Sequence, residues 1–151
     1  MYSKSFIHYV AKIMVDALLC LAVIAVVALP FVVKQLFLWI GYNDTAYIGI
    51  FASVLSLSGV GCVYILYNLK MMYKSLLVGD PFIDSNVNHL RRIALACFII
   101  AVIYFIKCIL LFTLASLMIA FVFMVGCLFC LTLKDLFKQA INFKTENELT
   151  I

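Results

Sequence analysis

Apolar residues dominate three long stretches of the chain, and most of the charged residues lie between them. The first stretch runs from about Ile13 to Val33 and the second from about Ala46 to Leu69. The third, from Ile93 to Leu133, has Lys107 as its only charge. As one helix this third stretch would be roughly 60 Å long, about twice the thickness of the bilayer core. The pattern therefore predicts that it folds back around Phe112 to Ser116, which gives four apolar helices.

Composition indicates the environment that these helices need. Of the 151 residues, 68% are hydrophobic and 12% are charged, and the mean hydropathy is +1.21. Soluble proteins contain about half apolar and about a quarter charged residues, and a soluble core could not hide this much apolar surface. We therefore predict an all-α integral membrane four-helix bundle in a single domain. Its expected parts are spans at residues 13–33, 46–69, 93–112 and 115–133, a corner at 70–92 and a tail at 134–151.

The basic residues predict the orientation of the bundle. All lysines and arginines except Lys34 and Lys107 fall at the N-terminus, in the corner or in the tail. By the positive-inside rule, both termini and the corner are therefore cytosolic. The net charge of +4 follows from this topology and from the anionic inner leaflet, so it requires no nucleic-acid partner. The first span is longer than the apolar region of a signal peptide, and we expect it to be retained.

Asp16 is the one charge within the first span, and an ionisable residue in a span is a candidate functional residue. Lys12 precedes it by four residues, a spacing that allows an ion pair at the membrane interface. The alternative is a proton or substrate relay, which would need a second buried polar group. We expect Lys107, the only charge in the last two spans, to extend toward the opposite face instead.

Cysteines and histidines offer little support for metal or redox chemistry. Cys127 and Cys130 form a C-x-x-C pair inside the fourth span, where a thiolate would be very costly. We expect these and the remaining cysteines to be apolar packing residues, with no metal or cofactor. The remaining ones are Cys20, Cys62, Cys97 and Cys108. His8 and His89 are expected in solvated cytosolic segments. No nucleophile and base, carboxylate pair or metal triad can be assembled in the spans, so we expect no enzyme activity.

The second span contains a stripe of small residues at three- and four-residue spacing. Its members are Gly49, Ala52, Ser53, Ser56 and Gly59. Small residues let neighbouring membrane helices approach closely. Packing within the bundle and homodimerisation both fit this stripe, and the sequence does not separate them.

The corner has the strongest local pattern outside the spans. Gly79 is suited to end the second helix, Asp80 to cap the next one, and Pro81 to occupy its first position. Arg91 and Arg92 are expected at the level of the lipid headgroups. After the fourth span, an amphipathic segment is expected to lie on the inner membrane surface or to pack under the corner.

Two motifs of the chain resemble those of a known family. Residues 79–93 match the pattern G-x-P-F-x-x-x-N-x-x-x-L-R-x-I, and residues 146–151 resemble an E-N-D-L-T-I/V ending with Glu148 in place of aspartate. Both are similar to motifs of a bacterial family of small four-span membrane proteins classed as a domain of unknown function. The resemblance implies a location in the bacterial plasma membrane. It also suggests a neighbouring gene, because members of the family are often encoded beside a small helix-turn-helix transcriptional regulator.

Two functional hypotheses follow. In the first, the protein is regulatory, and its corner and tail bind a soluble partner such as that regulator. The residues assigned to this role are Gly79, Pro81, Phe82, Asn86, Leu90, Arg91, Glu148, Leu149, Thr150 and Ile151. In the second, it is a small transport, efflux or immunity protein that acts against a membrane-active compound through Asp16 and the small-residue stripe. The corner and tail also fit a purely structural role in folding and topology.

Overall fold

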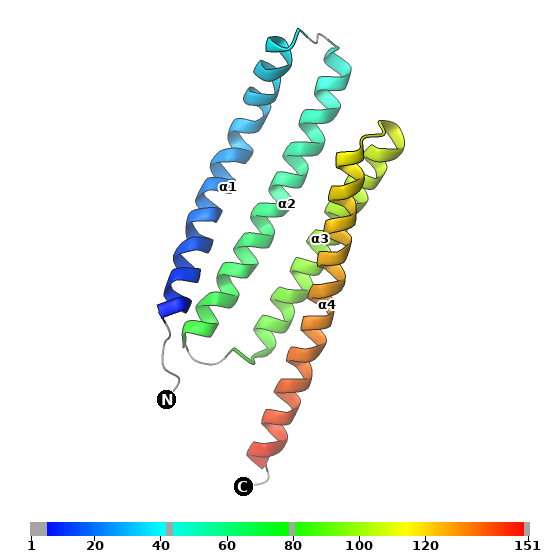
Figure 1. Ribbon diagram of the computed structural model, residues 1–151. Helices are drawn as coiled ribbons and strands as arrows, with labels where there is room; N and C mark the ends of the chain where they lie inside the picture. Colours follow the sequence, from blue (N-terminus) through cyan, green and yellow to red (C-terminus); the bar gives the residue numbers. More distant parts are fainter. Residues whose placement is uncertain (1–5, 42–43, 79–80, 150–151) are drawn as a thin grey trace.

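A computed structural model describes residues 6–41, 44–78 and 81–149, without the side chains of residues 6–8, 148 and 149. This part of the chain forms four helices, which are drawn in Figure 1. They are α1 (Phe6–Trp39), α2 (Thr45–Val78), α3 (Asp84–Leu110) and α4 (Leu114–Leu149).

All four helices are long and apolar enough to cross a membrane. The chain is therefore a multi-pass membrane protein, and the predicted all-α four-helix membrane bundle is confirmed. The helices are longer than the predicted spans. The 34 residues of α2, for example, would measure about 51 Å, against a bilayer core of about 30 Å. Each helix therefore extends beyond the hydrocarbon region.

The two ends of the bundle differ in which connections they hold. Both termini and the α2–α3 corner lie at one end, which we call the terminal end (Figure 1). The α1–α2 and α3–α4 connections lie at the other, which we call the loop end. At the loop end the chain reverses between α3 and α4 at residues 111–113.

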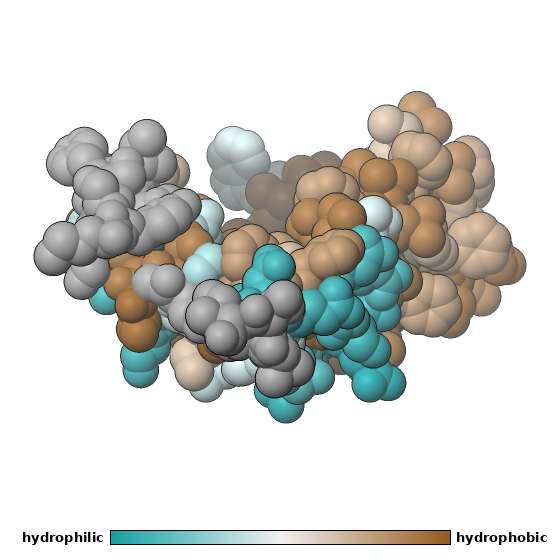
Figure 2. Space-filling view, turned by 90° about the horizontal axis from the view of Figure 1, so that it is seen from below, coloured by the Kyte–Doolittle hydropathy of each residue, from teal (hydrophilic) through white to brown (hydrophobic). Residues whose placement is uncertain are grey.

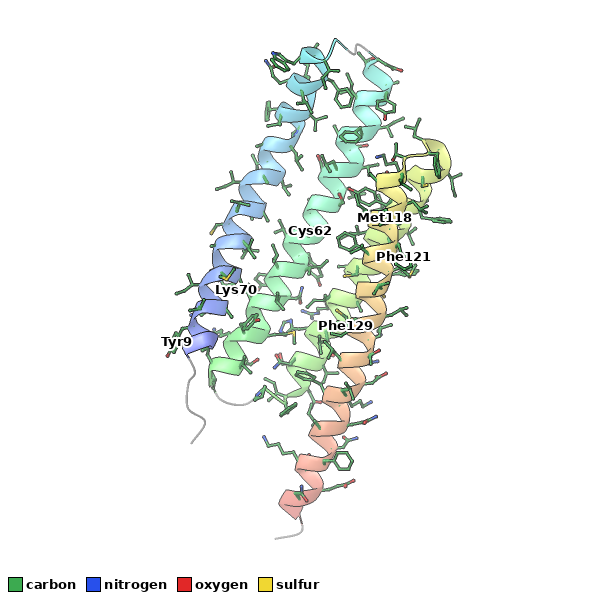
Figure 3. All side chains as sticks on the ribbon, viewed as in Figure 1. Tyr9, Cys62, Lys70, Met118, Phe121 and Phe129 are labelled. Carbon is green, nitrogen blue, oxygen red and sulfur yellow. The ribbon has the colours of Figure 1, made fainter. Side chains whose placement is uncertain are left out.

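The helices pack in chain order. Helix α1 contacts α2, α2 contacts α3, and α3 contacts α4. Helix α3 holds most of the buried residues, including Ile100 and Tyr104, which pack against Ala120 of α4. The outer face of α4 is apolar and exposed, and Met118, Phe121 and Phe129 lie along it (Figure 3). Such faces are suited to contact with lipid chains.

The small residues of the α2 stripe lie in different environments. A Cβ atom on Gly59 would lie 2.7 Å from Val26 Cγ2, so α1 approaches α2 closely at this point. A Cβ atom on Gly49 would meet nothing within 4 Å, and Ser53 is exposed. Gly61, which the sequence pattern did not single out, faces α3, where its Cβ would lie 2.8 Å from Ile100 Cδ1. The close contacts within the bundle are therefore made by Gly59 and Gly61.

The structure corrects the predicted start of the third helix. Helix α3 begins at Asp84, with Ile83 in an extended conformation as its N-cap. Pro81 therefore precedes the helix and does not occupy its first position, and the N-cap position belongs to Ile83. Gly79 and Asp80 themselves lie outside the described residues. Pro30 lies inside α1, which continues to Trp39.

The close approach at Gly59 leads to a stability prediction. Replacing Gly59 by leucine is expected to destabilise the bundle, because overpacking costs about 1–3 kcal/mol and Val26 has a stiff side chain. The measurement is the thermal unfolding midpoint of the purified protein in a mild detergent. Gly49→Leu, on the same helix with open space around it, is the matched control and is expected to unfold near the wild-type midpoint. Equal midpoints for the two variants would contradict the packing seen here.

Candidate functional site

Polar side chains gather at the terminal end of the molecule. Figure 2 views this end and shows hydrophilic residues clustered on it, with apolar surface beside them. The residues come from the last turns of α2, the first turns of α3 and the C-terminal part of α4. Hydrogen bonds between α2 and α3 position the residues of these two helices, and a contact between Phe82 and Phe137 joins the corner to α4.

Asn86 fixes the corner between α2 and α3. Its side chain is only 2% exposed. Its Nδ2 donates to the carbonyl oxygen of Pro81 at 2.7 Å, and its Oδ1 lies 2.8 Å from Ser75 Oγ on α2. The Ser75 hydroxyl also lies 2.8 Å from the carbonyl of Met72, and its single hydrogen serves one of these two acceptors at a time. The corner is thus held by side-chain bonds in place of the predicted cap.

A second polar contact joins α2 to α3, nearer the middle of the bundle. Asn68 is 1% exposed, and its Nδ2 donates to the carbonyl of Tyr64 at 2.8 Å. Its Oδ1 lies 2.9 Å from Nδ1 of His89, which assigns a proton to that nitrogen. His89 is therefore partly buried and bonded, and the prediction of a solvated histidine is wrong. His8 lies among the residues whose side chains are not described.

Asp16 is paired across helices. Lys70 of α2 places Nζ 2.9 Å from Asp16 Oδ1, and the two side chains are 42% and 36% exposed. Lys70 lies in the terminal half of α2, beside α1 (Figure 3). The predicted partner, Lys12, lies on α1 itself, and its side chain is exposed. The ion pair therefore joins α1 to α2, where the sequence suggested a pair within one helix.

The residues assigned to partner binding fall into three groups. Asn86 and Leu90, at 2% and 4% exposure, are inside the fold, and Pro81 is half-buried. Phe82 and Arg91 are exposed, and the Phe82 ring packs against Phe137 of α4 with the centroids 5.4 Å apart. The others lie outside the described residues or have undescribed side chains. These are Gly79, Glu148, Leu149, Thr150 and Ile151.

Helix α4 continues past the membrane region without a break. Residues 134–149 follow the predicted fourth span and add about 24 Å of helix. In Figure 1 this segment, which we call the α4 projection, extends beyond the ends of the other helices. It packs under the corner through Phe137, one of the two predicted arrangements. Its outer face carries Leu136 and Phe143, which are 54% and 65% exposed.

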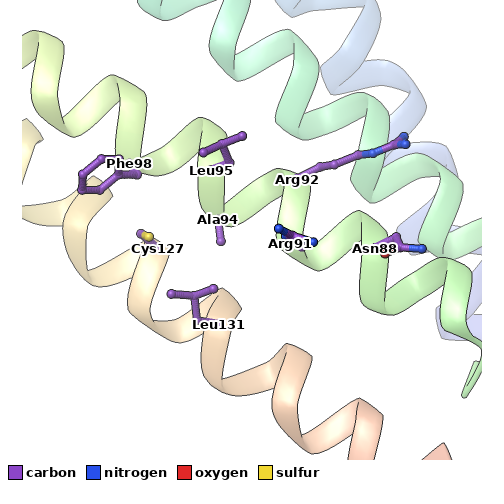
Figure 4. Close-up of a pocket in the computed structure, with 8 residues that line it drawn as sticks. All are labelled: Asn88, Arg91, Arg92, Ala94, Leu95, Phe98, Cys127 and Leu131. Atoms are coloured by element: carbon purple, nitrogen blue, oxygen red, sulfur yellow. The ribbon is translucent and has the colours of Figure 1, made fainter.

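A groove of about 700 Å³ lies between α3 and α4 near the terminal end (Figure 4). Asn88, Arg91 and Arg92 line one part of it, and apolar side chains such as Phe98 and Leu131 line the rest. A cationic mouth above an apolar floor has the polarity that an anionic phospholipid requires. Arg91 and Arg92 thus line this groove, and their contact with lipid headgroups stays a prediction.

Lys107 departs from its prediction. Lys107 lies in the loop half of the bundle, toward the end opposite the termini, but its side chain is only 7% exposed and is bonded to Ser116, so it does not extend to the surface there. Cys97 and Cys127 are also buried and pack together with Ile93 and Ala94. Among the described residues, no cluster of three or more His, Cys, Asp or Glu side chains is arranged to hold a metal ion.

A family model described as "Protein of unknown function (DUF2975)" matches residues 37–151. The chain belongs to the DUF2975 family. No curated protein and no solved structure matches it. The matched region contains α2, α3 and α4 together with the corner and the α4 projection, whereas α1 lies almost entirely outside it. This division agrees with the packing of this DUF2975 member, in which α1 contacts α2 alone.

The Asn86 contacts lead to a prediction about the corner. Asn86→Ala would leave the partly buried carbonyl of Pro81 without its donor, a loss of about 1–3 kcal/mol. We expect a lower thermal midpoint in detergent and faster proteolysis between α2 and α3. Asn88→Ala is the matched control, since Asn88 is an exposed asparagine two residues further along the same helix. If both variants behaved like the wild type, Asn86 would not hold the corner.

The Asp16–Lys70 pair leads to a second prediction. Lys70→Met and Asp16→Asn are each expected to lower the thermal midpoint, and the double variant is expected to lie no lower than the singles, because both changes remove one interaction. Lys12→Met serves as the control and should leave the midpoint unchanged. A lower thermal midpoint for Lys12→Met and an unchanged one for Lys70→Met would contradict the pair between helices and support an Asp16–Lys12 pair within α1.

Proposed function

We propose that this DUF2975 protein is a regulatory membrane protein that binds a soluble helix-turn-helix transcriptional regulator through the α4 projection. The carrying observation is the exposed apolar pair on that projection, Leu136 and Phe143. The terminal end is predicted to be cytosolic from the distribution of basic residues, and a DNA-binding regulator is available in that compartment. The choice of partner is supported by the resemblance to a family whose members are often encoded beside such a regulator.

The geometry of the projection favours a protein partner over the membrane surface. Leu136 and Phe143 are seven residues apart, so they share one face of the helix. The projection continues the long axis of α4 away from the bundle (Figure 1), and a helix in this direction cannot lay that face on the lipid headgroups. Large apolar side chains presented in water on one helical face are the anchors of helix-in-groove recognition.

The base of the projection is well fixed. Phe137, on another face of the same segment, packs against Phe82 of the corner, and the Asn86 bonds hold the corner to α2. A helix anchored in this way presents its outer face in a defined orientation, which lowers the entropy lost on binding. The corner residues of the sequence pattern thus support the docking face from behind.

Co-purification tests the proposal. The tagged full-length protein is co-expressed with the adjacently encoded helix-turn-helix regulator and purified in a mild detergent. We expect the wild type to retain the regulator. The double variant Leu136→Glu with Phe143→Glu is expected to retain at least about tenfold less regulator, because two apolar anchors become charged.

The matched control carries the same two new charges away from the Leu136–Phe143 face. Asn142→Glu with Thr145→Glu changes exposed residues of the projection and is expected to retain the regulator. Removal of residues 146–151 tests the tail separately. Each variant must elute from size exclusion as the wild type does. If the wild type captures no regulator, or if both double variants capture equal amounts, the proposed function is wrong.

A further inference from the structure

A cavity of about 220 Å³ lies in the loop half of the bundle, where α2, α3 and the start of α4 meet. Its lining is mostly apolar and aromatic, with Phe51 and Tyr104 among the rings. Its polar residues include Lys107, Thr113 and Ser116, besides the two tyrosines, Tyr47 and Tyr104. This cavity is at the opposite end of the molecule from the α4 projection, and no part of the proposed function uses it.

Lys107 is the unusual member of this lining. Its side chain is 7% exposed, and Nζ donates to Ser116 Oγ at 3.0 Å. Ser116 is itself 1% exposed and lies 2.6 Å from the hydroxyl of Thr113. Nζ also lies 4.8 Å from the centroid of the Phe51 ring. Among the described residues, no carboxylate lies within ion-pair distance of Lys107.

The protein compensates this buried charge only in part. The Phe51 ring attracts the ammonium, and the carbonyl groups at the C-terminal end of α3 carry partial negative charge near Lys107. An ammonium has three hydrogens to donate, and Ser116 takes one of them. A buried charge without a counter-charge is very costly, and charged residues inside membrane proteins commonly mark ligand or ion sites.

From these contacts we propose that the cavity binds a small organic anion, with its carboxylate or phosphate oxygens on Lys107 and Ser116 and an apolar body among the aromatic side chains. Lys107 supplies the counter-charge and the unused hydrogens, and the bonded hydroxyls of Ser116 and Thr113 have one hydrogen left between them as a further donor. A volume of 220 Å³ equals about seven water molecules at roughly 30 Å³ each, so the apolar body is short.

Binding of hexanoate to the purified full-length protein tests this site, with hexan-1-ol as the uncharged probe of similar size. Titration calorimetry in a neutral detergent measures both. We expect hexanoate to bind the wild type at least about tenfold more tightly than hexan-1-ol, as a charge-assisted bond to the ammonium implies. Lys107→Met is expected to remove this preference.

The control is Lys34→Met, which removes an exposed lysine of α1 and should leave the preference intact. Should Lys107→Met fail to fold, Lys107→Gln carries the same test. Native mass spectrometry separates the two sources of the anion. An anionic phospholipid retained from membranes by the wild type and lost from Lys107→Met identifies a lipid phosphate, whereas hexanoate binding to lipid-free protein identifies a free acid.

One result would overturn the proposal. If neither hexanoate nor a retained lipid distinguishes the wild type from Lys107→Met, then Lys107 is stabilised by Ser116 and Phe51 alone and the cavity is not an anion site.

Discussion

Within a bilayer, every buried polar group must find its partner inside the protein, because the hydrocarbon offers none. The polar contacts of this chain are arranged around that constraint. Ser58 of α2 lies 3.2 Å from the hydroxyl of Tyr104 on α3, and Asn68 of α2 meets His89 of α3. Both contacts join α2 to α3. The constraint therefore selects which faces of these helices meet, since apolar burial alone gives no preference between a neighbouring helix and lipid.

The sequence predicts the number and type of helices well, because long apolar runs have few alternatives in a chain of this length. It predicts less about contacts between helices. Lys12 is the partner of Asp16 that local spacing suggests, yet the structure pairs Asp16 with Lys70, which is distant in sequence. The small-residue stripe is a similar case. Gly59 and Gly61 face different neighbours, whereas Gly49 has open space, and periodicity along one helix cannot distinguish these environments.

In the corner, two residues of the sequence motif hold the fold together, although the sequence suggested that they bind a partner. Asn86 and Leu90 were expected to contact a partner, but both side chains are inside the fold. Their contribution is to hold α3 against its neighbours, so that Phe82 supports the α4 projection through Phe137. The exposed anchors, Leu136 and Phe143, lie outside the motif. An amphipathic pattern predicted this segment, but only the continuous helix shows that it extends along α4 beyond the ends of the other helices (Figure 1).

Lys70 and Lys107 show how differently two lysines of one apolar chain can be accommodated. Lys70 is partly exposed and has the carboxylate of Asp16 beside it, so its charge is balanced by the protein. Lys107 is buried more deeply, and the described groups beside its ammonium are a hydroxyl and two aromatic rings. A structural lysine at this position would gain from replacement by an apolar residue, because removing an uncompensated buried charge removes its desolvation cost. The retention of a cation beside a cavity is explained more simply if its counter-charge arrives with a ligand.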